Sequence, residues 1–208
     1  MSETPTGGGR EAPAGQWPVT LEGGVTESVV ATLGPNGKWN LAALGLFAGD
    51  PVTARTWGNT RTRRNFDRQG EGYVQFVDDP VLFVDAALSI TEREEPVCAD
   101  AMAWARVGVT QVDSGTAGET TWREWELEVR EGAVCEQRVP TINRGFNAVI
   151  EATVAVSRLG VTGYEDAVLL ERLEYLASVV DSAGGPRERE ALERVREQSA
   201  WARADRSD

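Results

Sequence analysis

The chain has 208 residues, enough to bury a hydrophobic core without disulfide or metal staples. It carries 21 basic and 33 acidic residues and no histidine, so its formal net charge is −12. This charge disfavours nucleic acid as the main partner, because nucleic acids are themselves densely negative. The missing imidazole excludes Ser-His-Asp and Cys-His nucleophile pairs and histidine zinc sites, and we expect no metal site. Chemistry near neutral pH must then use carboxylates, a cysteine or a bound cofactor.

The cysteines and the terminal sequence bear on the compartment. Cys98 and Cys135 are far apart and form no C-x-x-C pair, which is typical of ordinary half-buried thiols rather than a disulfide framework. The first 15 residues lack an apolar signal region, and no stretch has the roughly 20 apolar residues of a membrane helix. We therefore predict a soluble, cytoplasmic protein without a membrane partner. Lys38 is the single lysine, and the acidic excess is typical of a halophile.

The first two thirds of the chain have mainly β patterning. Residues 1–18 are rich in glycine, proline and threonine, and we expect them to form a disordered tail. Apolar runs at 25–32 and 39–47 are joined by Gly-Pro-Asn-Gly, which predicts a hairpin. Further strands are predicted at 52–57, 72–77, 102–112 and 124–130. About six strands with one short helix indicate a small antiparallel barrel.

Helical signals appear at two places. Asp79 followed by Pro80 predicts a helix start, with an N-cap carboxylate and a proline in the first turn. After Pro140 the apolar period changes from two to 3.6 residues, and three helices are predicted, the last with a thin apolar stripe. The predicted fold class is α+β. A mainly β barrel over residues 19–139 is followed by a helical C-terminal subdomain over 140–208.

Residues 55–66 are the strongest candidate for a binding segment. They include four arginines, three threonines and two asparagines, and no acidic residue. Guanidinium, hydroxyl and carboxamide groups are the donors that a phosphate monoester needs. The alternative is a solvated loop between strands, whose arginines pair with the surplus carboxylates. The spacing of these residues does not decide between the two interpretations.

Two other segments each have a functional and a structural interpretation. The segment 40–45 contains small residues and ends in glycine, so a flat ligand could lie against its backbone. The alternative is a core strand that bends at Gly45. Residues 143–152 begin a helix, whose N-terminus attracts anions and where Arg144 would add positive charge. The alternative is that Thr141 or Asn143 caps this helix and no ligand binds there. The paired carboxylates at 78–79 and 94–95 indicate no acid–base pair, so catalytic residues stay unassigned.

Four segments, in this order, resemble one known family. They are Asn40-Leu41-Ala42-Ala43-Leu44-Gly45, Thr60-x-Thr62-x-x-Asn65, Asp78-Asp79-Pro80-x-Leu82-Phe83 and Asn143-Arg144-Gly145-x-x-Ala148-Val149-Ile150-Glu151-Ala152. Over residues 22–180 the chain resembles an archaeal family of proteins of undefined function in the FMN-binding split-barrel superfamily. That superfamily is related to flavin reductases and pyridoxamine-phosphate-oxidase-like proteins. With the acidic composition, the resemblance points to a halophilic archaeon.

The resemblance implies an FMN-binding split β-barrel and a homodimer with FMN sites near the interface. Residues 40–45 would flank the isoalloxazine, while the Thr60-x-Thr62-x-x-Asn65 segment would hold the phosphate and ribityl chain. Arg55 is a further phosphate ligand by charge, and Gln75 stands where a strand asparagine is more usual. The residues expected to bind the cofactor are Asn40, Ala42, Ala43, Leu44, Gly45, Arg55, Thr60, Thr62, Asn65 and Arg144.

Three functional hypotheses follow from this sequence. The first is a flavin-reductase-like oxidoreductase that takes electrons from NAD(P)H and passes them to an unknown acceptor. The missing histidine is compatible with it, because a flavin itself performs hydride and electron transfer. The second is a non-catalytic FMN-binding carrier or sensor. The third is a structural dimer with an empty barrel, in which the arginine segment pairs with carboxylates.

Overall fold

The computed structural model describes residues 9–201, which form two compact units. The first unit contains the described residues up to Asp78 and the segment Thr91–Arg138, and the second contains Asp79–Ile90 and the described residues from Val139 onward. The strands are β1 (Arg10–Glu11), β2 (Val25–Leu33), β3 (Trp39–Phe47), β4 (Thr53–Trp57), β5 (Glu71–Val77), β6 (Thr91–Arg93), β7 (Ala101–Ala117) and β8 (Thr120–Val134). The helices are α1 (Arg61–Gln69), α2 (Pro80–Leu88), α3 (Arg144–Val156), α4 (Asp166–Ala183) and α5 (Pro186–Glu197).

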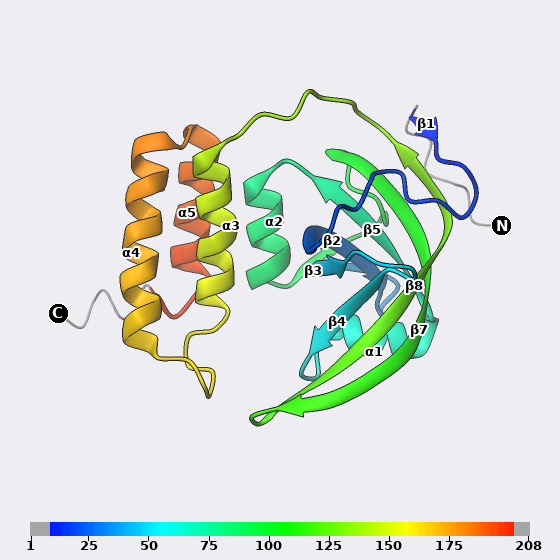
Figure 1. Ribbon diagram of the computed structural model, residues 1–208, viewed down its shortest axis with the longest axis horizontal. Coiled ribbons are helices and arrows are strands. Elements are labelled where there is room, and N and C mark those ends of the chain that lie inside the picture. Colours follow the sequence, from blue (N-terminus) through cyan, green and yellow to red (C-terminus); the bar gives the residue numbers. More distant parts are fainter. Residues whose placement is uncertain (1–8, 202–208) are drawn as a thin grey trace. The chain divides into compact units, whose positions relative to one another are not determined.

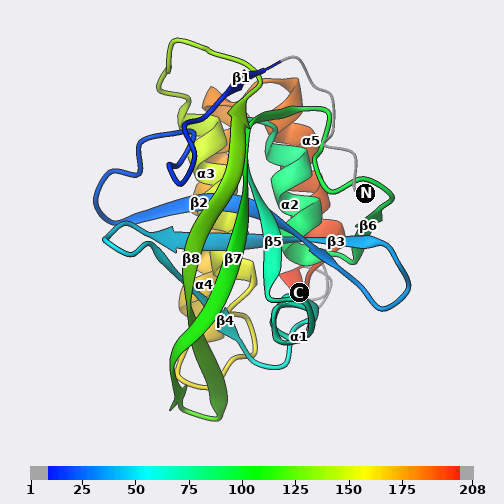
Figure 2. The same cartoon turned by 90° about the vertical axis from the view of Figure 1, so that its right-hand side faces the viewer.

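The first unit is a closed antiparallel barrel (Figures 1 and 2). Its ring runs β2–β3–β4–β8–β7–β5 and closes because β5 pairs back onto β2. Beyond the ring, β1 pairs with β8 and β6 pairs with β3. The interior is filled by apolar side chains that include Val30, Leu46, Phe66, Val107 and Trp125. The structure thus confirms the barrel that the β patterning predicts, because alternate residues of each strand meet in one dry core.

The β2–β3 hairpin forms where the sequence predicts it. Its register runs without interruption from Val25 opposite Phe47 to Leu33 opposite Trp39. In the turn, the Gly34 N–H donates to the Lys38 carbonyl at 2.8 Å, and Gly37 has a φ of +78°. Only glycine adopts that left-handed conformation without a steric penalty, which explains its place in the turn.

The N-terminal segment is more ordered than its composition indicates. Residues 1–8 lie outside the described part of the chain, but Arg10 and Glu11 pair with Val134 and Ala133 of β8. The Trp17 ring packs edge-on against a barrel residue, Phe76, with 6.3 Å between ring centroids. The predicted tail therefore ends earlier than residue 18, because β8 offers an edge for pairing and Trp17 has apolar surface to bury.

The second unit is built from α2, α3, α4 and α5. Its core contains Val84, Val149, Leu173, Val180 and Leu192, each almost completely buried. The predicted helix start is confirmed, since the Val81 N–H donates to Asp79 Oδ1 at 3.0 Å. The α2 segment belongs to this unit, although it precedes β6 in the sequence. No helix among residues 9–201 combines the length and the apolar character needed to span a membrane.

Charged side chains fix α5 to its neighbours within this unit. Arg187 donates to both carboxylate oxygens of Asp79, at 2.9 and 2.5 Å, and this pairing raises the pKa of Arg187 above its ordinary value. The buried Glu188 accepts the Gly185 N–H and an amide N–H of Asn143, both at 2.8 Å. These contacts explain why a helix with a thin apolar stripe still packs.

A buried glutamine joins β5 to the loop that precedes β7. Gln75 is fully buried, donates from Nε2 to the Pro96 carbonyl at 3.0 Å and accepts the Cys98 N–H at 2.6 Å through Oε1. Both polar ends of the side chain are therefore satisfied by backbone. Gln75 has a structural contact in this fold, at the strand position where the resemblance expects asparagine.

We predict that Gln75→Leu lowers the free energy of unfolding by about 2–3 kcal/mol, because it leaves a buried carbonyl and a buried N–H without partners. Urea titration followed by tryptophan fluorescence measures this effect. The exposed Gln111→Leu on β7 is the matched control and should change stability by less than about 0.5 kcal/mol. Equal midpoints for the two variants would contradict the assigned role of Gln75.

Candidate functional site

The arginine-rich segment is folded as a strand end and a helix. β4 ends at Trp57, and α1 begins at Arg61 with Thr60 as its N-cap, whose Oγ1 accepts the Arg63 N–H at 3.3 Å. The helix ends at Gly70, where φ is +66°. The loop interpretation of this segment is therefore wrong. Because Phe66 is the single large apolar residue in α1, the apolar periodicity that reveals a helix is missing from the sequence.

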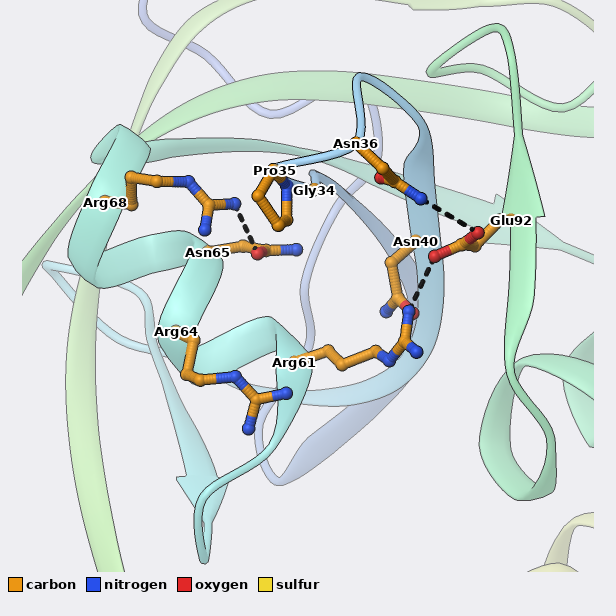
Figure 3. A pocket seen from close by; sticks show the side chains of 9 residues that line it. All are labelled: Gly34, Pro35, Asn36, Asn40, Arg61, Arg64, Asn65, Arg68 and Glu92. Atoms are coloured by element: carbon orange, nitrogen blue, oxygen red, sulfur yellow. Dashed lines mark hydrogen bonds and ion pairs between the residues drawn. The ribbon is translucent and has the colours of Figure 1, made fainter.

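One face of α1 borders a cavity of about 400 Å³, a volume typical of small-molecule sites. The cavity lies within the barrel unit, between α1, the β2–β3 turn, β3 and β6 (Figure 3). Its lining residues are Gly34, Pro35, Asn36, Asn40, Arg61, Arg64, Asn65, Arg68 and Glu92. The four α1 residues in this list have the spacing i, i+3, i+4 and i+7, which places them on one side of a helix.

The cavity concentrates positive charge in an acidic protein. Arg61 forms an ion pair with Glu92 at 2.6 Å. Arg64 instead donates to the Asn59 carbonyl at 2.6 Å, and Arg68 donates to the Leu33 carbonyl at 2.7 Å. Within residues 9–201, neither Arg64 nor Arg68 pairs with a carboxylate. Three guanidinium groups and one carboxylate give the lining a formal charge of +2 in a chain of net charge −12.

Amide side chains in the cavity wall are held in fixed orientations. The buried Asn65 donates from Nδ2 to Thr32 Oγ1 at 2.9 Å and accepts from Arg68 at 2.7 Å. Asn40 is also buried and donates to the Leu41 carbonyl at 3.3 Å. These bonds lock the side chains before any ligand arrives, so binding costs little conformational entropy. The arrangement suits an anion attached to a polar, hydroxyl-bearing group.

The structure separates the predicted phosphate ligands. Asn65 lines the cavity, whereas Thr60 caps α1 and Thr62 is buried, and neither of these threonines is among the lining residues. Arg55 also lies outside the lining. Its Nε and NH2 groups bind Glu124 Oε2 at 3.0 and 2.8 Å, and its guanidinium lies 4.6 Å from the Trp122 ring centroid. Arg55 thus pairs with a carboxylate in this structure, and its contact with a phosphate stays a prediction.

The other predicted residues fall in three places. Asn40, at the start of the β3 segment, lines the cavity. Ala42 and Leu44 pack in or against the barrel core, while Ala43 and Gly45 lie opposite β2 residues in the sheet. Arg144 is the first residue of α3, in the helical unit. Whether these side chains contact a flavin stays a prediction.

Sequence reasoning missed several cavity residues. Arg61 and Arg64 lie in the arginine-rich segment 55–66, but composition alone does not distinguish them from Arg55 and Arg63. Arg68 lies beyond that segment, although its helical spacing from Arg61 and Arg64 was available in the sequence. Asn36 and Glu92 could not be found without the fold, since a turn and the short β6 bring them to the cavity.

Lys38, Tyr73 and Cys98 of the barrel unit have raised pKa values, each with a structural cause. Lys38 pairs with Glu94 at 3.0 Å, and this carboxylate raises the pKa of the lysine. Burial raises the pKa of the Cys98 thiol and of the Tyr73 phenol, so both stay protonated at neutral pH. Residues 9–201 contain no cluster of three or more cysteine or carboxylate side chains placed to hold a metal ion.

Comparison with known proteins places this architecture among the flavin-reductase-like split barrels, with helices following the barrel. The chain matches the N-terminal domain of the protein of unknown function DUF447 over residues 26–136 and its second domain over 143–197. The chain belongs to the DUF447 family. The resemblance and the α+β split-barrel fold expected from the sequence are both confirmed.

Several solved structures are similar to this chain. An FMN-bound DUF447 protein from Methanosarcina mazei is 25% identical, with a TM-score of 0.72 over 85% of this chain and 96% of that one. A flavin reductase complexed with NADP+ is 16% identical, with a TM-score of 0.40 over 55% of this chain and 81% of that one. The styrene monooxygenase flavin reductase from Pseudomonas putida S12 is 13% identical, with a TM-score of 0.42 over 56% and 93%.

We predict that Thr60→Ala lowers the free energy of unfolding by about 1 kcal/mol, because the first turn of α1 loses its side-chain cap. Thr60→Ser keeps the hydroxyl and should remain close to wild type. Urea unfolding of ligand-free protein measures both variants. If Thr60→Ala were as stable as wild type, the cap would be contradicted, and the hydroxyl would be free for another role.

Proposed function

We propose that this protein binds FMN and that the cavity beside α1 receives its phosphate. The observation that carries this proposal is the pair Arg64 and Arg68, two cavity guanidinium groups without carboxylate partners in the described part of a strongly acidic chain. A phosphate monoester carries a charge of about −1.5 to −2 at pH 7, which matches the lining charge of +2. The FMN-bound relative from Methanosarcina mazei supports the choice of flavin.

The residues present fit the group. Guanidinium forks bind phosphate oxygens with two parallel hydrogen bonds, and Arg64 and Arg68 lie one turn apart on α1. Asn65 lies between them, and Asn40 supplies a buried amide on the opposite element, β3. Amide groups of this kind can exchange hydrogen bonds with the hydroxyls of a ribityl chain. The β3 segment that follows Asn40 remains the proposed flank of the isoalloxazine ring.

We further propose that the protein is a flavin-reductase-like oxidoreductase that uses NAD(P)H and passes electrons to an unknown acceptor. Bound FMN would supply hydride and electron transfer, while the chain's own residues anchor the phosphate and orient the ring. The second candidate, a non-catalytic FMN carrier or sensor, shares the same site and differs in turnover. A salt-rich cytoplasm is the proposed setting, which the acidic excess supports.

A homodimer is also proposed. Its support is a set of exposed apolar side chains on neighbouring barrel strands, namely Val25 on β2, Phe47 on β3 and Trp57 on β4. Val25 and Phe47 are direct register partners, so their side chains lie together on the sheet. Apolar surface of this kind is typical of a face that another protein surface covers.

We predict that the double variant Arg64→Ala/Arg68→Ala weakens FMN binding by about two orders of magnitude or more, because it removes two charge-assisted donors to the phosphate. Riboflavin, which lacks the phosphate, should bind wild type and variant with similar affinity. Quenching of flavin fluorescence on titration measures both ligands.

Arg63→Ala is the matched control for this experiment. Arg63 lies on the same helix, but its guanidinium donates to the Gly58 carbonyl at 3.0 Å and to Thr121 Oγ1 at 3.2 Å, outside the cavity lining. This variant should keep the wild-type preference for FMN over riboflavin. An equal loss in both variants would argue against phosphate binding at Arg64 and Arg68, and failure of wild type to bind any flavin would overturn the proposed function.

Turnover is tested with the FMN-loaded wild-type protein under anaerobic conditions. The oxidoreductase proposal predicts that NADH or NADPH bleaches the visible absorbance of the flavin, because flavins accept a hydride from nicotinamides. Flavin that stays oxidised with both nicotinamides would contradict that proposal and favour the carrier or sensor.

A further inference from the structure

The cavity contains one side chain whose charge opposes the proposed ligand. Of the nine lining residues, Glu92 alone carries a negative charge, beside three arginines. We propose that Glu92 is a charge filter, which directs a single phosphate to the Arg64–Arg68 side and rejects ligands that carry a second phosphate. This inference rests on the proposed function and narrows the ligand class to monophosphates of hydroxyl-bearing molecules.

Contacts on two sides fix the position of the Glu92 carboxylate. Oε1 pairs with Arg61 NH1 at 2.6 Å, and Oε2 accepts from Asn36 Nδ2 at 3.2 Å. The backbone of Glu92 lies opposite Asn40 in the β3–β6 pairing. In Figure 3 this carboxylate stands across the cavity from the Arg64, Asn65 and Arg68 side chains of α1. The cavity therefore has a cationic side and a side that accepts hydrogen bonds.

The two sides of the cavity differ in charge. Glu92 neutralises Arg61, so Arg64 and Arg68 remain as the positive charges for an incoming anion. The Glu92 side chain is 25% exposed, so water screens its charge less than on an open surface and the carboxylate repels a nearby anionic group. A phosphate placed beside Glu92 is disfavoured, whereas a hydroxyl there can donate to the carboxylate oxygens. A ribityl phosphate can place its phosphate at the arginines and a hydroxyl at Glu92, whereas a diphosphate would place a second anionic group beside Glu92.

A purely structural role for Glu92 is the competing explanation, because the same contacts join β6 to α1 and to the β2–β3 turn. Loss of such structural contacts would weaken the binding of all anions alike. A charge filter instead changes the preference between anions of different charge. The ratio of two affinities therefore separates the two explanations, even if a variant is somewhat less stable.

The test uses the full chain and two probes, inorganic phosphate and inorganic pyrophosphate, titrated by calorimetry at pH 7 in one buffer. Glu92→Gln and Glu92→Ala remove the charge. Both should raise the affinity for pyrophosphate relative to phosphate by about tenfold, because the more highly charged probe gains more from losing the carboxylate.

One matched control accompanies these variants. Glu94→Gln removes a carboxylate two residues away that pairs with Lys38 and does not line the cavity. This control should keep the wild-type ratio of affinities.

The possible results distinguish failure of the charge filter from failure of the proposed flavin function. A ratio that does not change in either Glu92 variant overturns the charge filter. An equal change in Glu94→Gln also overturns it, and so does a wild-type protein that binds neither anion. FMN binding is measured separately by fluorescence. Wild-type protein that binds FMN while the ratio stays constant overturns the filter alone, whereas a shifted ratio without FMN binding overturns the proposed flavin function.

Discussion

The repulsion among three guanidinium groups on one face of α1 is the constraint on which the site depends. Arg61, Arg64 and Arg68 occupy successive turns of a nine-residue helix, and only Arg61 has a carboxylate partner within the described residues. Like charges at this spacing destabilise a helix by themselves. The helix persists because other α1 side chains anchor it to the barrel, and its unneutralised charge is then available to an anionic ligand.

The barrel supplies that anchoring. The Phe66 side chain of α1 is buried in the barrel core, where its ring packs against Trp125 with 5.3 Å between centroids. Asp67 pairs with Arg123 of β8, and Asn65 bonds to Thr32 of β2. Two strands of the ring, β8 and β2, thus hold one short helix. A helix too short to be stable alone is in this way positioned as a rigid wall of the cavity.

The sequence predicted the architecture better than the site. Alternating apolar residues, the Gly-Pro-Asn-Gly turn and the Asp79 cap are local signals, and the barrel strands, the hairpin and α2 follow from them. The sequence does not predict the α1 helix, because burial of Phe66 alone replaces the apolar stripe that usually marks a helix. Arg55 and Arg64 look alike in sequence, yet one is neutralised by Glu124 and the other faces the cavity. Only the strand pairing of β4 with β8 reveals that difference.

A crystal structure of the protein grown with FMN tests the central claim most directly. We predict that the flavin phosphate lies within hydrogen-bonding distance of the Arg64 and Arg68 guanidinium groups, with the Arg55–Glu124 pair intact. Phosphate bound at Arg55, or flavin seated away from the α1 cavity, would contradict the account.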